Sequence, residues 1–211
     1  MSTTRIGYDL IIEEIPERSR VLDLGCGDGE LLTELADAKR VNAYGVEISA
    51  EGVSRCLEKG LYVYQGDIDE GLADYRSGSF DYVILNQTLQ DTKRPLYVIT
   101  ESLRIGRFAI VSFPNLGYAA NRFQLMFRGV MPKNHLFSYN WYDTPNIHIM
   151  SIRNFSELCR ENRYPIQTER HFSMRPHGSV HRRRVFPNLF AEYGFFILRG
   201  RDAATRPQET S

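Results

Sequence analysis

The amino-acid sequence predicts an α/β protein built on a doubly wound, mostly parallel sheet. Short apolar segments alternate with amphipathic helical segments as far as Pro114, and the connections between them are short. Such an alternation predicts parallel strands with right-handed helical crossovers on both faces of the sheet. The segment Val21–Leu32 passes from an apolar run through three glycines at alternate positions into a helix start, which is where an open α/β sheet receives a nucleotide-like ligand.

The individual elements follow from periodicity and from start and stop signals. Arg5–Ile15 has apolar residues at helical spacing and ends at Pro16, so we expect a helix there. The expected strands are Arg20–Leu24, Arg40–Ile48, Leu61–Gln65, Phe80–Leu85 and Phe108–Phe113. The expected helices between them are Glu30–Ala38, a helix that begins after Ser49 and ends at Gly60, a short turn near Asp69–Tyr75, and Pro95–Ile105.

The alternation stops after Pro114. Residues 115–150 are aromatic and contain several glycine and proline residues, which predicts a lid insertion: a helix followed by loops over the carboxyl ends of the strands. Later elements are expected at Asn154–Asn162 (helix) and at Ile166–Phe172 and Tyr193–Leu198 (strands), with an exposed loop at Ser173–Asn188. The sequence therefore predicts a single domain, residues 1–200, with a helical and aromatic lid at about 115–150 and a disordered tail at 201–211.

Length and composition narrow the class of protein. A chain of 211 residues with 42% hydrophobic and 25% charged residues is ordinary for one soluble globular domain. Lysine plus arginine and aspartate plus glutamate are 26 each, so net charge gives no reason to expect nucleic acid or a membrane surface as a partner. No apolar run approaches the ~20 residues that span a bilayer, and the first residues lack the apolar core of a signal peptide. The three cysteines have no paired spacing, so we expect a cytoplasmic protein with neither a disulfide framework nor a metal site.

The glycine-rich turn fits two kinds of adenosine-containing ligand, a dinucleotide or S-adenosylmethionine. The dinucleotide fingerprint needs a third glycine where this chain has Glu30, because that glycine lets the helix pack closely on the strand. Asp23 lies two residues before the first glycine, Gly25, where a carboxylate would repel a pyrophosphate but attract the ammonium and sulfonium groups of S-adenosylmethionine. We therefore expect S-adenosylmethionine or its demethylated product, S-adenosylhomocysteine.

The ends of the next strands carry side chains that suit the rest of this ligand. Glu47 ends the second strand, where an acidic side chain can accept hydrogen bonds from both ribose hydroxyls. Asp67 ends the third strand and suits the adenine amino group, with Ile48 and the Ile68 backbone beside the ring, and Asn86 follows the fourth strand. Each residue alone could be a helix cap or a turn residue, but together and in this order they favour a ligand site. The predicted cofactor-binding residues are Asp23, Gly25, Cys26, Gly27, Glu47, Ile48, Asp67, Ile68 and Asn86.

Several stretches carry a resemblance to known families. Val21–Gly29 resembles the first motif of class I S-adenosylmethionine-dependent methyltransferases, and the order Glu47, Asp67, Asn86 follows their later motifs. The stretches that look more narrowly like the MetW family of methionine biosynthesis are Arg20–Leu32, Phe80–Gln90, Ser112–Asn115 and Tyr139–His148. The resemblance implies a seven-stranded, Rossmann-like sheet in the order 3-2-1-4-5-7-6 with the last strand antiparallel. It also implies a protein complex with homoserine O-acyltransferase, in which the family member is a required partner or activator.

Two functions stay open on the sequence. The first is an S-adenosylmethionine- or S-adenosylhomocysteine-binding protein that supports homoserine acylation as a partner of the acyltransferase. The second is an active methyltransferase that acts on a small molecule. The narrower resemblance favours the first. The amide-methylating motif is absent, since the position after the fourth strand reads Asn86–Leu89, and no catalytic residue is assigned. Candidates in and beside the insertion are Asn115, Tyr139, Tyr142 and His148.

Two further stretches bear on partners. The dense apolar stretch Phe123–Met131 fits either a docking surface or a lid folded onto the edge of the sheet. Residues 170–184 form a basic loop that contains the run His181–Arg184. Because the chain is neutral overall and no RNA-binding module flanks the domain, we expect this loop to be solvated or to meet an acidic or phosphate-bearing partner rather than a nucleic acid.

Overall fold

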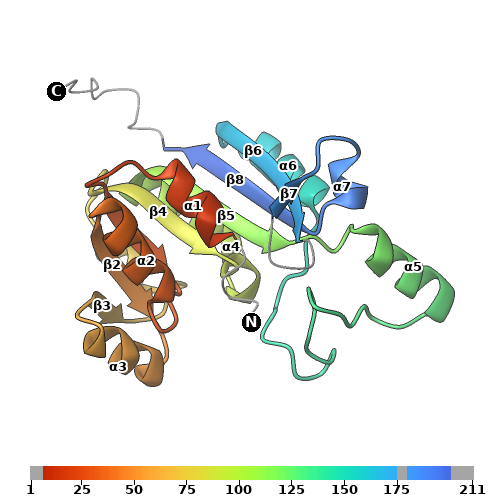
Figure 1. The fold of residues 1–211 in the computed structure, drawn as a ribbon, viewed down its shortest axis with the longest axis horizontal. Helices are drawn as coiled ribbons and strands as arrows, with labels where there is room; N and C mark the ends of the chain where they lie inside the picture. The colour runs from red at the N-terminus through yellow and green to blue at the C-terminus, as the bar shows by residue number, and fades with distance from the viewer. Residues whose placement is uncertain (1–6, 175–179, 201–211) are drawn as a thin grey trace.

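An eight-stranded sheet forms the centre of the structure, a computed structural model that describes residues 7–174 and 180–200 (Figure 1). The strands are β1 (Arg20–Leu24), β2 (Asn42–Glu47), β3 (Tyr62–Gln65), β4 (Phe80–Asn86), β5 (Gly106–Pro114), β6 (Ile166–Met174), β7 (Val180–Arg182) and β8 (Tyr193–Arg199). Their order in the sheet is β3-β2-β1-β4-β5-β8-β6-β7. Strands β1 to β5 are parallel, and β8 is antiparallel to both of its neighbours. The carboxyl ends of the five parallel strands therefore lie along one edge of the sheet.

The strand order confirms the predicted arrangement with one addition. Without β7 the order is the expected 3-2-1-4-5-7-6, in which the last strand, β8, runs antiparallel. The additional strand is β7, which pairs with Phe172–Met174 of β6. It lies within Ser173–Asn188, which the sequence predicts to be an exposed loop. The one-turn helix α7 (Pro187–Phe190) begins in the same stretch. The loop prediction was wrong there because a polar strand at the edge of a sheet lacks the apolar alternation that identifies inner strands.

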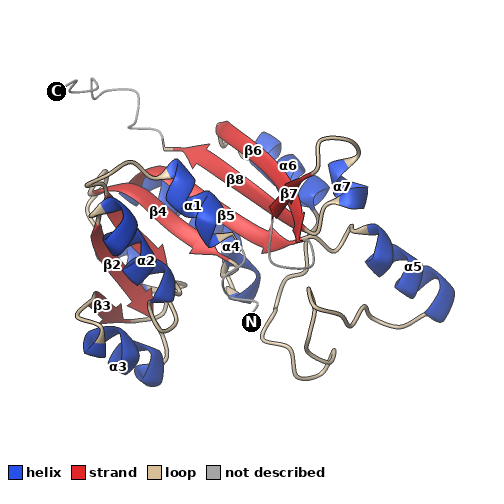
Figure 2. Cartoon of the chain, in the orientation of Figure 1, coloured by secondary structure: helices blue, strands red, loops and turns tan. Residues whose placement is uncertain are grey.

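Helices cover both faces of the sheet (Figure 2). They are α1 (Tyr8–Glu14), α2 (Glu30–Lys39), α3 (Ala50–Glu58), α4 (Pro95–Ile105), α5 (Ala119–Arg128) and α6 (Ile152–Glu161), with the short 3₁₀ helices η2 (Gly71–Asp74) and η3 (Leu89–Asp91). Two hydrophobic cores result, because α1 and α2 pack on one face and α4 and α6 on the other. Neighbouring strand residues alternate between the cores: Val21 belongs to the first and Leu22 to the second.

Local signals set where two of these helices begin and end. Ser49 caps α3, since its Oγ accepts a hydrogen bond from the Gly52 N–H at 3.4 Å. Gly60 follows the end of α3 in the left-handed conformation, at φ +74°. Pro95 is the first residue of α4, where its missing N–H costs no hydrogen bond. These boundaries agree with those expected from the sequence.

The insertion consists of α5 followed by residues 129–151, which contain no further helix or strand. Helix α5 extends away from the sheet (Figures 1 and 2), and Asn121 is its only buried residue. Near the end of the insertion, the N–H groups of Ile147 and His148 donate to the carbonyl of Gln90 at 2.8 and 2.9 Å. The expected helix is therefore present, and the end of the insertion lies against η3 at the carboxyl end of β4.

Asn115, at the start of the insertion, is a buried structural hub. Its Nδ2 donates to the carbonyls of Ala191 at 2.8 Å and Asn188 at 3.3 Å. Its Oδ1 accepts from the N–H groups of Gly117 at 2.9 Å and Ile152 at 3.2 Å. An amide side chain has two donors and two acceptor positions, so all of them are occupied. Asn115 ties β5 to α6 and to the turn before β8, and it retains no free polar group for catalysis.

The first helix partly neutralises the basic loop. Arg170 forms ion pairs with Glu13, at 3.4 Å, and with Glu14, while Arg182 pairs with Glu13 at 3.4 Å. Residues 175–179 of this loop and the expected tail at 201–211 lie outside the described residues. Among the residues that are described, no helix has the length and apolar character needed to cross a bilayer.

Candidate functional site

A pocket of about 430 Å³ opens at the carboxyl edge of the sheet. It is lined by Gly25, Val46, Glu47, Ile48, Gly66, Asp67, Ile68, Asp69, Asn86, Gln87, Thr88, Asp91, Thr92 and Lys93. Six of the nine predicted cofactor-binding residues are among them: Gly25, Glu47, Ile48, Asp67, Ile68 and Asn86. The parallel strands β1 to β4 bring these residues together although the chain separates them widely. We refer to this pocket as the cofactor pocket.

Positive φ angles shape the glycine turn at the end of β1. Gly25 and Gly27 adopt φ +75° and +58°, which residues with a side chain rarely adopt. A Cβ atom on Gly25 would lie 2.6 Å from Cγ2 of Thr88, so a larger residue would collide with the opposite wall of the pocket. The N–H groups of Gly25 and Cys26 donate to the Val46 carbonyl at 2.8 and 3.1 Å, which ties the turn to β2. Both glycines are therefore needed for the turn, and Gly25 is needed also for the space beside Thr88.

Glu47 ends β2 with its carboxylate held in place. Oε2 accepts a hydrogen bond from the Gly27 N–H and Oε1 accepts one from the Ser49 N–H, both at 2.8 Å. The residue is only 9% exposed, yet each carboxylate oxygen keeps a second acceptor position. An oriented carboxylate of this kind suits a ligand with two neighbouring hydroxyl groups.

Asp23, in β1 just before the glycine turn, is a buried acid that is 3% exposed. Burial, aided by the negative charge of Glu47, raises the pKa of the Asp23 carboxyl group to about 7. Within the described part of the chain, no donor forms a hydrogen bond with this carboxylate and no cation pairs with it. The surroundings of Asp23 therefore favour a ligand that brings its own positive charge.

Binding of a cationic adenosyl ligand is expected to strengthen as pH rises through about 7. The positive charge favours the ionised form of Asp23, so binding releases the proton that the empty protein holds at lower pH. Between pH 5.5 and 7.5 the affinity for S-adenosylmethionine should rise on the order of tenfold. Titration calorimetry in buffers of different ionisation enthalpy measures both the affinity and the released proton. An affinity that falls with pH over this range would contradict the role of Asp23.

Asp23, Cys26 and Gly27 belong to the predicted set but do not line the pocket. The Cys26 side chain packs against β2, since a Cβ atom on Gly45 would lie 2.5 Å from its Sγ. The thiol also contacts Cys56, and burial raises the pKa of Cys26 above its usual range. Any contact of Cys26 with a ligand is therefore left to its backbone.

Sequence reasoning missed one wall of the cofactor pocket. The buried carboxylate of Asp69 accepts hydrogen bonds from the N–H groups of Lys93 and Arg94, both at 2.8 Å, and so joins the turn after β3 to the turn after β4. Gln87 adopts φ +55°, a strained backbone conformation of the kind that clusters at functional sites. Partial burial raises the pKa of Asp91 to about 6. Asp69 and Asp91 lie in turns without a periodic pattern, so no signal in the sequence identifies them; Gln87 follows Asn86 directly, at the strand end where the amino-acid end of the cofactor is expected.

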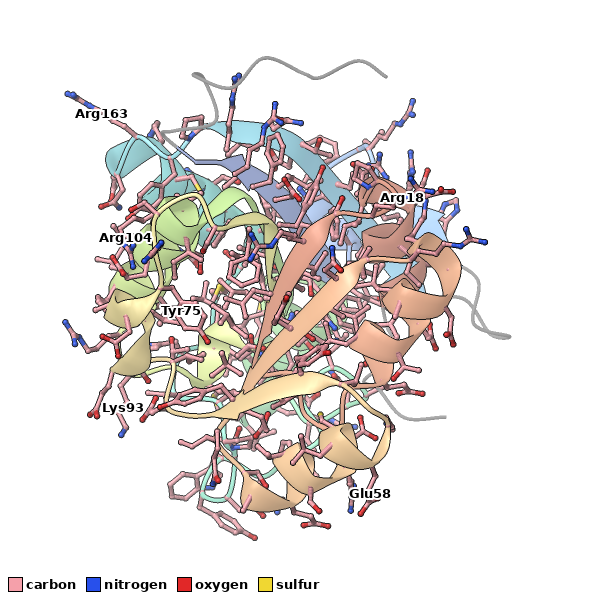
Figure 3. The ribbon with its side chains drawn as sticks, turned by 90° about the vertical axis from the view of Figure 1, so that its left-hand side faces the viewer. Arg18, Glu58, Tyr75, Lys93, Arg104 and Arg163 are labelled. Carbon is pink, nitrogen blue, oxygen red and sulfur yellow. The ribbon has the colours of Figure 1, made fainter. Side chains whose placement is uncertain are left out.

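Arg104, on α4, fixes the turn that follows β3. Its guanidinium donates to the carbonyls of Leu72 at 3.0 Å and Tyr75 at 2.6 Å, and Glu101 pairs with it at 2.6 Å. Figure 3 shows Arg104 above Tyr75 on one flank of the domain, with Lys93 below both. Helix α4 thereby holds η2 and the adjoining wall of the pocket in place.

The remaining catalytic candidates lie away from the cofactor pocket. Tyr139 and Tyr142 line a second pocket of about 350 Å³, formed by the insertion together with Leu116 and here called the insertion groove. His148 lines neither pocket. Its Nε2 is buried and has no hydrogen-bond partner among the described residues. The structure therefore brings none of these three side chains to the site predicted for the cofactor.

Residues 5–198 match the family described as methionine biosynthesis protein MetW. The chain belongs to the MetW family. A relative from Rhodopirellula baltica, named bifunctional methionine biosynthesis protein MetXA/MetW, is 35% identical to this MetW-family chain over 176 residues. The match covers 79% of the chain but 28% of the relative, so the chain spans little more than a quarter of that protein's length.

Solved structures share the fold of this MetW-family chain. A methyltransferase of Thermotoga maritima that depends on S-adenosylmethionine, described as a possible histamine N-methyltransferase, matches with a TM-score of 0.65 and 16% identity over 93% of this chain and 90% of its own. The magnesium protoporphyrin IX methyltransferase of Synechocystis, with bound S-adenosylhomocysteine, matches with a TM-score of 0.62 and 17% identity over 94% and 85%. The fold is therefore the Rossmann-like fold of class I methyltransferases.

Proposed function

We propose that this MetW-family protein binds S-adenosylmethionine or S-adenosylhomocysteine in the cofactor pocket and acts in methionine biosynthesis as the partner of a homoserine O-acyltransferase. The observation that carries the ligand assignment is a set of acids at one edge of the sheet: the buried Asp23, the oriented Glu47 and Asp67 across the pocket. Glu47 and Asp67 line the pocket, and Asp23 lies buried in the adjoining strand β1; this concentration of carboxylates disfavours a phosphate-bearing ligand. It favours a ligand with a positive charge and with hydroxyl and amino donors.

Each part of the adenosyl ligand has a suitable protein group. We assign the ribose hydroxyls to Glu47, the adenine amino group to Asp67, and the ring face to Ile48, which is 65% exposed beside the pocket. The ammonium group is assigned to Asp23, and the rest of the amino-acid end to Asn86 and the backbone of the glycine turn. When it carries its methyl group, the ligand supplies an electrophilic sulfonium.

The proposed partner rests on the fused relative. The name of that protein joins MetXA to MetW, and the part outside the match, almost three quarters of its length, leaves room for a second enzyme. Joining two proteins in one chain converts their association into an intramolecular event at high effective concentration. A fusion is therefore most useful for proteins that act as a complex, and we propose the same complex for the separate chain.

Mixing the purified protein with the homoserine O-acyltransferase of the same organism is expected to raise the rate of acyl transfer and to give a joint peak in size-exclusion chromatography. Repeating the assay with S-adenosylmethionine and with S-adenosylhomocysteine identifies the ligand to which the complex responds. An unchanged rate together with separate elution would refute the partnership. Calorimetry with each ligand on the isolated protein tests the pocket assignment independently of that outcome.

A second candidate function, methyl transfer to a small molecule, is favoured by the pocket wall after β4. Asp91 lines this wall, and its pKa of about 6 is near neutral pH, which suits a general base. The strained Gln87 lines the same wall. Release of S-adenosylhomocysteine on incubation with metabolites of the pathway, lost in Asp91→Asn but with cofactor affinity retained, would support this function.

A further inference from the structure

The insertion concentrates apolar surface that the other described residues leave uncovered. Residues 119–149, here called the docking segment, contain more than half of the exposed large apolar side chains found in the described chain. Six of them make the argument: Phe123, Met126, Phe127, Met131, Trp141 and Tyr142. Aromatic residues and methionine are the types enriched at the centres of protein interfaces. A monomeric protein rarely exposes so much apolar surface in one contiguous segment.

Helix α5 presents the first part of this surface. Phe123 and Phe127 lie one turn apart, and their rings stack with centroids 5.8 Å apart and planes 6° apart. They are 56% and 73% exposed, because α5 extends away from the sheet (Figure 2) and forms no extensive contact with another described helix or strand. A helix with an exposed apolar face that the described residues leave uncovered is a usual recognition element for another protein.

The insertion groove provides the second part. Its volume is about 350 Å³, and Met131, Trp141 and Tyr142 are among the residues that line it. Trp141 and Tyr142 meet edge to face at a centroid distance of 5.6 Å, which holds the two exposed rings in a defined arrangement. A groove beside an exposed aromatic helix can receive an anchoring side chain of a partner, the arrangement typical of interface hot spots.

Charge argues against a second copy of this chain as the occupant. The docking segment contains Arg122, Arg128 and Lys133 but a single acidic residue, Asp143. The Asp143 carboxylate already accepts hydrogen bonds from the N–H and Nδ2 of Asn140, at 2.6 and 2.9 Å. In a two-fold symmetric dimer formed by two such surfaces, these cations would lie opposite those of the other copy and repel them. A different protein with an apolar centre and an acidic rim fits better.

We infer that the docking segment is the surface on which the homoserine O-acyltransferase seats; this inference rests on the partnership proposed above. The fused relative supports that occupant, since its name joins MetXA to the part that this chain resembles. The segment is also connected to the cofactor pocket. Ile147 and His148 bind the Gln90 carbonyl, and Gln90 belongs to η3, whose last residue, Asp91, lines that pocket.

The test uses full-length protein, the purified acyltransferase and a matched pair of variants. Phe127→Glu places a charge in the docking segment. Tyr62→Glu places the same charge on β3, an edge strand on the side of the molecule away from α5 (Figure 1). The two wild-type side chains are similarly exposed, 73% and 74%. Phe127→Glu should weaken the complex about tenfold or more, as loss of an interface anchor does. Tyr62→Glu should bind the acyltransferase like the wild type, and both variants should keep wild-type affinity for S-adenosylmethionine.

The contrary outcomes separate the surface from the function. If Phe127→Glu binds the acyltransferase like the wild type, or if Tyr62→Glu weakens binding as much as Phe127→Glu does, the docking segment is not the binding surface. Either result would leave the proposed partnership unaffected. A homodimer that Phe127→Glu abolishes, with acyltransferase binding intact, would reassign the surface to a second copy. Absence of any complex with the wild type, with cofactor binding intact, would remove the partnership and this inference together.

Discussion

Asp23→Asn is expected to abolish measurable binding of S-adenosylmethionine and, at the same time, to stabilise the empty protein. The loss of binding follows because the variant removes the buried negative charge that we assign to the ligand's ammonium group. The gain in stability follows from burial: a carboxyl group whose pKa rises from 3.8 to about 7 on folding destabilises its ionised native state by about 4 kcal/mol. The buried asparagine amide offsets part of this, so we expect a net gain of about 2 to 4 kcal/mol at pH 8.

The pH dependence of this gain distinguishes its cause. Between about pH 4 and pH 7 the native protein holds a proton on Asp23 that the unfolded chain has released, so the wild type loses stability as pH rises through this range. The variant lacks this loss, and the two proteins should converge below about pH 4. Urea unfolding at pH 5 and pH 8 measures the difference. Asp28→Asn, a more exposed acid of the same turn that pairs with Lys59 at 3.4 Å, is the control and should change neither property much.

Asn115→Ala is expected to lower the free energy of unfolding by about 3 kcal/mol or more, because four hydrogen bonds, three of them buried, disappear and leave their backbone partners unpaired. For a domain of this size, the melting temperature should fall by roughly 6 °C or more. Asn162→Ala is the matched control: its Nδ2 makes one hydrogen bond, to the Leu158 carbonyl at 2.9 Å, and its loss should cost about 1 kcal/mol. A melting temperature of Asn115→Ala equal to that of the control would show that the hub does not hold the sheet to α6.

The part of the fold that could be predicted is the part that local signals specify. Helix α4 begins at Pro95 and ends at Ile105, as expected. Helix α3 begins after Ser49 and ends before Gly60, because a capping residue or a left-handed glycine acts on the residues next to it in the chain. The positions of Glu47 and Asp67 at the edge of the pocket were also predictable. Parallel strands end at a common edge, so the residue that ends each strand is identified once the strands are.

What could not be predicted depends on contacts between distant residues. Asp69 forms the pocket wall through hydrogen bonds to residues 24 and 25 positions away, and nothing in its neighbourhood indicates them. From the sequence, Asn115 was expected to be a free polar side chain at the end of a strand. In the structure its Nδ2 donates to the carbonyl of Ala191, 76 positions later. Cys26 lies in the glycine turn at the end of β1, but its side chain packs against β2. Gly45 of β2 has no side chain, and the Sγ of Cys26 fills the space this leaves. In each case tertiary packing decides the role.

The position of β8 has a consequence for how the domain is made. Synthesis delivers β6 and α6 before β8, yet β8 lies between β5 and β6 in the sheet. The ring of Phe196 in β8 stacks on that of Phe113 in β5, with centroids 5.8 Å apart, and its centroid lies 4.7 Å from that of Phe155 in α6. The rings of Phe113 and Phe155 therefore stay exposed on the nascent chain until β8 has been made. A product that terminates before Tyr193 exposes them permanently and becomes a substrate for chaperones and proteases. The aromatic packing between β5, β8 and α6 is therefore completed only once β8 has been synthesised.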